Sequence, residues 1–224
     1  MFVTQCVRRC AVLTPDKPAL VCGNRTTTFG ELRDRVARCA GGLLELGLTP
    51  GARVAILGIN SDRVLELMYG SICAGGAPHN VNIRWAVPEQ AYAIDDSGAT
   101  MLVVDAHFAD RLPALRAQCP SVEHVLYLGD GAAPDGTLSY EDLVAKSGPV
   151  PDQCTDPDAV AFLNYTGGTT GLSKGAVLTH RNVVAGVLQG DAWFRPALEA
   201  DGGDASRANV ILALPMYHIF AGGM

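Results

Sequence analysis

A glycine- and threonine-rich stretch carries the clearest chemical signal in this sequence: residues 165–175 read Y-T-G-G-T-T-G-L-S-K-G. Glycine lets the backbone approach a ligand closely, and successive backbone N–H groups in a tight turn can form a concave anion site. Hydroxyls and one ammonium group add donors, and a hydrogen bond to a charged group contributes roughly 1.5–3 kcal/mol. The combination predicts a loop that binds the phosphates of a nucleotide. The residues predicted to bind phosphate are Thr166, Gly167, Gly168, Thr169, Thr170, Gly171 and Lys174.

The spacing within this stretch differs from that of a Walker A loop, in which lysine directly follows the last glycine and precedes serine or threonine. Here two residues separate Lys174 from the last glycine, and Gly175 follows the lysine. A flexible surface loop between two strands is the alternative interpretation, with a solvated lysine and threonines that cap turns. Under the phosphate-binding interpretation, Thr170 is also the candidate ligand for a Mg²⁺ ion carried by the nucleotide.

The segments around the loop predict the elements that position it. An apolar run over residues 159–163 predicts a buried strand that leads into the loop. Residues 176–178 predict a strand after the loop, and residues 180–190 predict a helix. A polar segment over residues 195–208 predicts an exposed loop, and residues 210–214 predict a last strand.

Upstream of the loop, predicted strands alternate with predicted helices, which is typical of βαβ units in a mainly parallel sheet. The dipeptide Gly23-Asn24 is a hairpin signal, and a capping box begins a helix after Thr28. We therefore predict the α/β class, with helices flanking a mainly parallel sheet and right-handed crossovers. The other predicted strands cover residues 53–59, 77–81, 101–104 and 122–128, and the other predicted helices cover residues 61–74, 88–98 and 106–118, with a short helix from Ser139 and a linker over residues 148–158.

Composition and charge exclude several classes of protein. Of the 224 residues, 48% are hydrophobic and 18% are charged, which excludes a disordered chain. The formal net charge of −6 argues against a nucleic-acid-binding surface. The seven cysteines are odd in number and lack a C-x-x-C pair, so we expect reduced thiols in a cytoplasmic protein. The sequence contains neither a signal peptide nor an apolar run long enough to span a membrane, and peripheral membrane contact stays open.

Residues 165–175, followed by T-H-R-N at residues 179–182, resemble the AMP-binding signature of the acyl-adenylate-forming superfamily, Y-T-S-G-T-T-G-x-P-K-G. This chain has Gly167 in place of the serine and Ser173 in place of the proline, and its double glycine resembles the variant in bacterial fatty-acyl-CoA ligases. The glycine removes one hydroxyl and keeps the backbone amides, so we expect phosphate binding to persist. Residues 14–105 also resemble the N-terminal region of that family.

A second motif, L-P-M-Y-H over residues 214–218, resembles the family's L-P-[LM]-[FY]-H. By this resemblance His218 lies beside the acyl carboxylate and the α-phosphate, so His218 and Lys174 are the expected catalytic residues. Tyr217 and Phe220 are expected to approach the acyl pocket together with His218. A structural core histidine remains the alternative for His218. For the other histidines, His180 is expected to orient the loop, and His79, His107 and His124 receive no role.

The resemblance implies a two-step reaction. A carboxylate attacks the α-phosphate of ATP to give acyl-AMP and pyrophosphate, and a thiol, usually CoA, then displaces AMP. The family thus implies ATP, Mg²⁺ and CoA, with a fatty acid as the expected carboxylate, in an acid–thiol ligase of the fatty-acyl-CoA synthetase type. Three alternatives stay open: adenylation of another carboxylate, a non-catalytic nucleotide-binding fragment, and a different phosphate-binding enzyme such as a kinase.

The resemblance also implies the N-terminal part of the family's large domain. Residues 50–191 are expected to form one α/β subdomain that carries the phosphate loop. Residues 1–49 and 192–224 are expected to belong to a second α/β subdomain whose sheet is incomplete. The family's later motifs and its C-terminal domain, which supplies a catalytic lysine, are absent from this sequence, so we expect these 224 residues alone to show little or no ligase activity.

Overall fold

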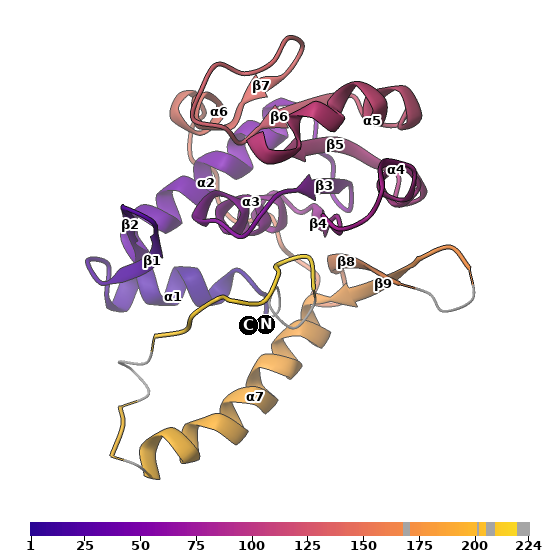
Figure 1. Cartoon of the computed structure of the whole chain (residues 1–224). Coiled ribbons are helices and arrows are strands. Elements are labelled where there is room, and N and C mark those ends of the chain that lie inside the picture. The colour runs from indigo at the N-terminus through magenta and orange to yellow at the C-terminus, as the bar shows by residue number, and fades with distance from the viewer. Residues whose placement is uncertain (168–170, 201, 205–208, 219–224) are drawn as a thin grey trace.

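The computed structural model describes all residues except 168–170, 201, 205–208 and 219–224 (Figure 1). Its centre is a five-stranded parallel sheet in the order β4-β3-β5-β6-β7, and two antiparallel hairpins lie outside this sheet. The strands are β1 Pro18–Cys22, β2 Arg25–Thr28, β3 Arg53–Leu57, β4 Ala77–Asn80, β5 Ala99–Val104, β6 His124–Tyr127, β7 Leu138–Ser139, β8 Val160–Thr166 and β9 Lys174–Thr179. The helices are α1 Gln5–Leu13, α2 Phe29–Glu45, α3 Asp62–Cys73, α4 Val87–Asp96, a 3₁₀ helix Ala106–Arg111, α5 Leu112–Gln118, α6 Tyr140–Lys146 and α7 His180–Ala200.

Strand β3 lies inside the sheet and is apolar on both faces, as a strand covered by helices on both sides must be. Val54 and Ile56 belong to the core shared with α2, α3 and α6. Ala55 and Leu57 belong to a second core, on the other face, shared with α4 and α5. Because β3 and β4 are parallel neighbours, the segments that follow them emerge at the same edge of the sheet.

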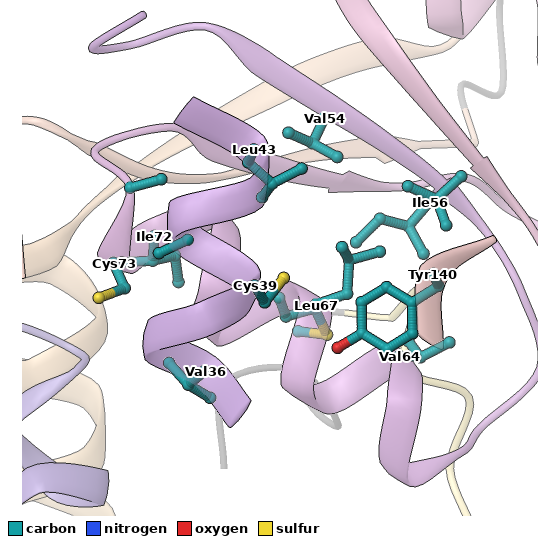
Figure 2. Close-up of a cluster of buried hydrophobic side chains, with 14 of the residues drawn as sticks. Val36, Cys39, Leu43, Val54, Ile56, Val64, Leu67, Ile72, Cys73 and Tyr140 are labelled. Atoms are coloured by element: carbon teal, nitrogen blue, oxygen red, sulfur yellow. The ribbon is translucent and has the colours of Figure 1, made fainter. Parts of the chain in front are cut away.

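The first core is formed where α2 packs against α3. Figure 2 shows Cys39 of α2 beside Leu67 of α3, with the ring of Tyr140 next to Leu67. The two helices approach so closely at Gly70 that a side chain there would collide with the sulfur of Cys39. This packing fixes the helical layer on one face of β3.

A charged network lies at the edge of this core. The Glu66 carboxylate, on α3, is only 2% exposed and accepts a 2.7 Å bond from Nε of Arg35 and a 3.1 Å bond from the Tyr140 hydroxyl. Arg35 also contacts Glu141 at 3.1 Å, and Arg63 donates to Glu141 at 2.7 Å. The bond to Glu66 raises the pKa of the Arg35 guanidinium above its usual value, so the arginine stays charged. The network joins α2, α3 and α6 through opposite charges.

Most of the predicted fold is confirmed. The α/β class with a mainly parallel sheet is as expected, and strands β3, β4, β5 and β6 overlap the predicted ranges. The hairpin at Gly23-Asn24 forms between β1 and β2. The capping box is present, since Thr28 Oγ1 accepts from the Glu31 N–H and the Glu31 carboxylate accepts from the Thr28 N–H.

Two predicted helix boundaries were wrong. The helix predicted over residues 106–118 is divided into a 3₁₀ turn and α5, because Pro113 lacks an N–H and suits only the first turn of a new helix. Helix α7 continues to Ala200, through the start of the segment predicted as an exposed loop. Within α7, Arg195 pairs with Asp191 one turn earlier, at 2.7 Å, which supports the helix on its solvent side.

The strand predicted over residues 210–214 was also wrong: the described segment 209–218 contains no strand. A strand needs a neighbouring edge for its ladder of hydrogen bonds, and side chains of the sheet satisfy this segment instead. The carbonyls of Leu212 and Leu214 accept bonds from the Asn60 amide. The segment is therefore held by bonds to side chains and not by a strand ladder.

Helix α7 projects from the rest of the chain (Figure 1). His180 at its start is buried, whereas large apolar side chains further along, such as Trp193 and Phe194, are exposed. Among the described residues, no helix combines the length and the apolar character needed to cross a membrane.

Replacing Arg35 with methionine should lower the free energy of unfolding by about 3 kcal/mol, because the buried Glu66 carboxylate loses its cationic partner. Arg33→Met is the matched control, since Arg33 is exposed on the same helix, and it should change the free energy by no more than about 0.5 kcal/mol. Urea denaturation measures both values. Equal losses in the two variants would contradict a structural role for the Arg35–Glu66 pair.

Candidate functional site

The predicted phosphate loop connects β8 and β9, so it is the turn of an antiparallel hairpin. Thr166 and Lys174 are opposite each other across this hairpin, and Tyr165 is opposite Gly175. Opposite residues share a face of the ribbon and successive residues alternate between faces. The Thr166 hydroxyl and the Lys174 ammonium group therefore share one face, and the Tyr165 ring lies on the other.

The described residues of the loop suit an anionic ligand. Thr166, Gly167, Gly171 and Lys174 are all exposed. A side chain at Gly167 would meet no atom within 4 Å, so the backbone there is open to an incoming group. Gly171 has a φ of 153°, which side-chain-bearing residues rarely adopt. A hydroxyl and an ammonium group on one face, beside open backbone, fit the oxygens of a phosphate.

Part of the predicted site lies outside the described residues. This applies to Gly168, Thr169 and Thr170 of the loop and to Phe220 near the second motif. The predicted Mg²⁺ ligand, Thr170, is among them.

The second motif is held by asparagines at the carboxyl ends of two neighbouring strands. The Asn60 amide, just after β3, donates to the carbonyls of Leu212 and Leu214 at 3.0 and 2.8 Å, and its oxygen accepts from the Met216 N–H at 2.8 Å. The Asn80 amide, at the end of β4, donates to the Met216 carbonyl at 2.9 Å. The Met216 side chain is buried in the first core. Four hydrogen bonds and one apolar anchor thus fix the backbone that leads into the motif.

Tyr217 and His218 follow this anchored segment directly. Tyr217 is half-buried and His218 is exposed. The His218 N–H donates to the Pro215 carbonyl at 2.9 Å, which closes a turn after the proline. The His218 side chain is thus outside the buried core, and its role at a ligand stays a prediction.

Both motifs are attached to β4 through successive residues of that strand. His79 contacts the Tyr165 ring, with ring centroids 4.7 Å apart, and Asn80 binds Met216. His79, Asn60 and Asn80 were not among the residues predicted to form the site. Polar residues at the carboxyl ends of adjacent parallel strands are the signal that could have identified the two asparagines.

His180 joins the start of α7 to the N-terminal segment. It is buried, its Nδ1 accepts a 3.2 Å bond from the Val3 N–H, and its ring meets Phe2 edge-on at 5.4 Å. Burial lowers the pKa of His180 below its usual value, so the ring is neutral near pH 7. These contacts attach His180 to the N-terminal segment, and its expected role in orienting the loop stays a prediction.

A hollow of about 830 Å³ lies away from both motifs, between the β1–β2 hairpin and helices α2, α3 and α6. Its arginines are already paired: Arg25 with Asp62 at 2.6 Å, and Arg35 and Arg63 with the carboxylates described above. Its charges therefore stabilise the contact between elements and leave little capacity for an anionic ligand.

The glycine-rich hairpin loop and the anchored second motif point to a nucleotide-dependent enzyme, and the comparison with known families decides which. Residues 7–224 match the AMP-binding enzyme family. The chain belongs to this family. The resemblance seen in residues 165–175 and 214–218 is therefore confirmed at the level of the family.

Individual relatives agree with this assignment to the AMP-binding family. The long-chain-fatty-acid–CoA ligase of Salmonella typhimurium is 33% identical over 233 residues, covering 92% of this chain and 40% of the relative. A feruloyl-CoA synthase from Amycolatopsis sp is 34% identical over 218 residues, covering 97% of this chain and 40% of that protein. This chain thus spans 40% of the length of these relatives.

A solved structure confirms the fold of an N-terminal part of an AMP-binding enzyme. The inhibitor-bound N-terminal domain of FACL13 from Mycobacterium tuberculosis matches with a TM-score of 0.79 at 26% identity, covering 99% of this chain and 53% of that one.

Asn60→Ala should release the segment that leads into the second motif, because three hydrogen bonds to its backbone are lost. Amide hydrogen exchange at Met216 should rise by about tenfold or more, since each bond contributes roughly 1 kcal/mol. The control is Asn24→Ala, at an exposed position in the β1–β2 turn. Unchanged exchange at Met216 would show that the side-chain bonds do not hold the segment.

Proposed function

We propose that this chain supplies the ATP-phosphate-binding and carboxylate-facing parts of an acid–thiol ligase, which forms an acyl-AMP and then a CoA thioester. The observation that carries the proposal is the pairing of Thr166 with Lys174 on one face of a hairpin whose loop bears the AMP-binding signature. Membership of the AMP-binding family supports the same chemistry. The substrates proposed are ATP with Mg²⁺, CoA and a carboxylic acid.

Lys174 acts on the phosphates. Its ammonium group supplies a full positive charge next to backbone that is open at Gly167, which suits oxygens that gain negative charge as the α-phosphate is attacked. Thr166, the loop glycines and Thr169 supply hydrogen-bond donors, and Thr170 is the proposed ligand for the nucleotide-bound Mg²⁺. In this reaction the chain's own residues position the phosphates and stabilise charge.

His218 acts at the carboxylate. It is exposed just after a segment fixed by Asn60 and Asn80, so its position is set by the carboxyl edge of the sheet. In the proposal His218 lies beside the carboxylate and the α-phosphate, and Tyr217 and Phe220 border the acyl group. Ligands of open α/β sheets collect at this edge.

The proposed carboxylate is a fatty acid. Relatives named long-chain-fatty-acid–CoA ligases support this choice, and so does the double glycine of the loop. An aromatic carboxylate is the second candidate, because the feruloyl-CoA synthase is equally similar and covers more of the chain. The seven free cysteines support a cytoplasmic location.

Lys174→Ala should weaken ATP binding by about tenfold to a hundredfold, because a charge-assisted contact worth roughly 1.5–3 kcal/mol is removed. Lys146→Ala is the matched control: Lys146 is an exposed lysine on α6, paired with Asp142. Isothermal titration calorimetry with ATP and Mg²⁺ measures both affinities. Equal affinity in the parent protein and Lys174→Ala would contradict the phosphate role.

Carboxylate-dependent ATP–pyrophosphate exchange by the complete gene product should be stimulated by palmitate or octanoate and abolished by Lys174→Ala. Stimulation by ferulate alone would instead favour the aromatic candidate. ATP binding without exchange for any carboxylate would favour a non-catalytic nucleotide-binding protein, and phosphoryl transfer to another acceptor would favour a kinase.

A further inference from the structure

The loop that carries the phosphate-binding signature is attached to the sheet by the residue that precedes it. Tyr165 lies on the face of the β8–β9 ribbon opposite to Thr166 and Lys174. Its hydroxyl donates a 2.5 Å hydrogen bond to the Asp96 carboxylate, and its ring is tilted by 35° against the ring of His79. Residues from β8, α4 and β4 thus meet at the base of the loop.

The opposite strand of the hairpin is shaped around the same ring. A side chain at Gly175 would place its first carbon 3.1 Å from the Tyr165 ring and 3.1 Å from Leu163. These contacts are tighter than most side chains make, so a side chain at position 175 would have to displace the Tyr165 ring or Leu163 by a few tenths of an ångström. The half-buried Tyr165 ring thus contacts His79 and lies close to Gly175 of β9.

The position of Asp96 is unfavourable for its own helix. It is the last residue of α4, follows another aspartate, and has no basic residue in the last turn. A negative charge at the C-terminal end of a helix is repelled by the helix dipole. Asp96 is exposed, so this cost is small, and its bond to Tyr165 is the favourable contact that the structure gives it. Burial and this bond raise the pKa of the Tyr165 hydroxyl, so it stays protonated and acts as the donor.

The position of His79 is more costly, because its polar ring is buried. The side chain is fully buried, and neither ring nitrogen has a hydrogen-bond partner in the part of the chain that the structure describes. Burial lowers its pKa to about 4, so the ring is neutral near pH 7. A buried polar group without a partner destabilises the fold. What His79 does provide is a flat, uncharged ring against Tyr165.

From these contacts we infer that Asp96 and His79 are positioning residues, which act through Tyr165 to fix the base of the phosphate loop and so align Thr166 and Lys174 for ATP. The inference rests on the proposed function. It assigns to the two residues a role that neither helix stability nor core packing accounts for. Asp96 fixes the end of the Tyr165 side chain, and His79 fixes the plane of its ring.

The experiment combines ATP affinity with a measurement that needs no ATP. Calorimetry gives the affinity, and NMR hydrogen exchange at the amides of Thr166 and Lys174 reports the order of the loop base. Asp96→Ala and Tyr165→Phe should each weaken ATP binding by about tenfold and raise the exchange rates, since each removes the same charge-assisted bond. The double variant should bind ATP no more weakly than either single variant, because the two residues act as one unit.

Matched variants separate positioning from general destabilisation. Asp95→Ala, one residue earlier on the same helix, should leave affinity and exchange within about twofold of the parent. His79→Phe keeps a ring against Tyr165 and should bind ATP as the parent protein does. His79→Ala should bind ATP about tenfold more weakly. Rescue by phenylalanine supports a role for the ring plane. Equal loss in both His79 variants would overturn that role.

Unchanged exchange at Thr166 and Lys174 in Asp96→Ala would overturn the inference, whether or not the protein binds ATP. Additive losses in the Asp96 and Tyr165 variants would overturn it as well. Failure of the parent protein to bind ATP contradicts the proposed function instead, and the exchange rates then still decide whether Asp96 and His79 order the loop base.

Discussion

The alternation of side chains at the end of β4 is the constraint on which the candidate site depends. His79 and Asn80 are consecutive, so they point to opposite faces of the sheet. One face receives Tyr165 and with it the phosphate loop, and the other receives Met216 and with it the second motif. Because β4 is an edge strand, its end is accessible to both segments. The two motifs, about fifty residues apart in the chain, are thereby attached to one short stretch of backbone.

The molecule divides into a well-packed support and lightly attached functional segments. The support is a parallel sheet with apolar layers on both faces, reinforced by the buried Glu66 carboxylate and its partners. The functional segments place a few residues in this core, Phe162 and Met216 among them, and beyond these they are held by individual side chains such as Asn60 and Tyr165. Segments of this kind open at low free-energy cost, which suits a site that must admit and release substrates.

Local patterns in the sequence were sufficient for the class, the sheet and most elements, because β3 and the capped start of α2 are specified by neighbouring residues. Local patterns were insufficient where residues distant in the sequence determine the structure. Residues 210–214 have the composition of a strand, yet the bonds from Asn60, about 150 residues away, replace a ladder. His79 was assigned no role because nothing near it in sequence shows that Tyr165 will cover it. The loop was recognisable because its glycines, hydroxyls and lysine are contiguous.

The adjacency of His79 and Asn80 also limits how this region can vary in length. Inserting or deleting one residue within β4 would reverse the orientation of every side chain beyond that point, so each motif would face the wrong partner. Gains and losses of residues should therefore accumulate in connections such as 129–137, where neither motif is attached. Across natural variants, the number of residues between the end of β3 and the end of β4 should stay constant, while the lengths of those connections vary.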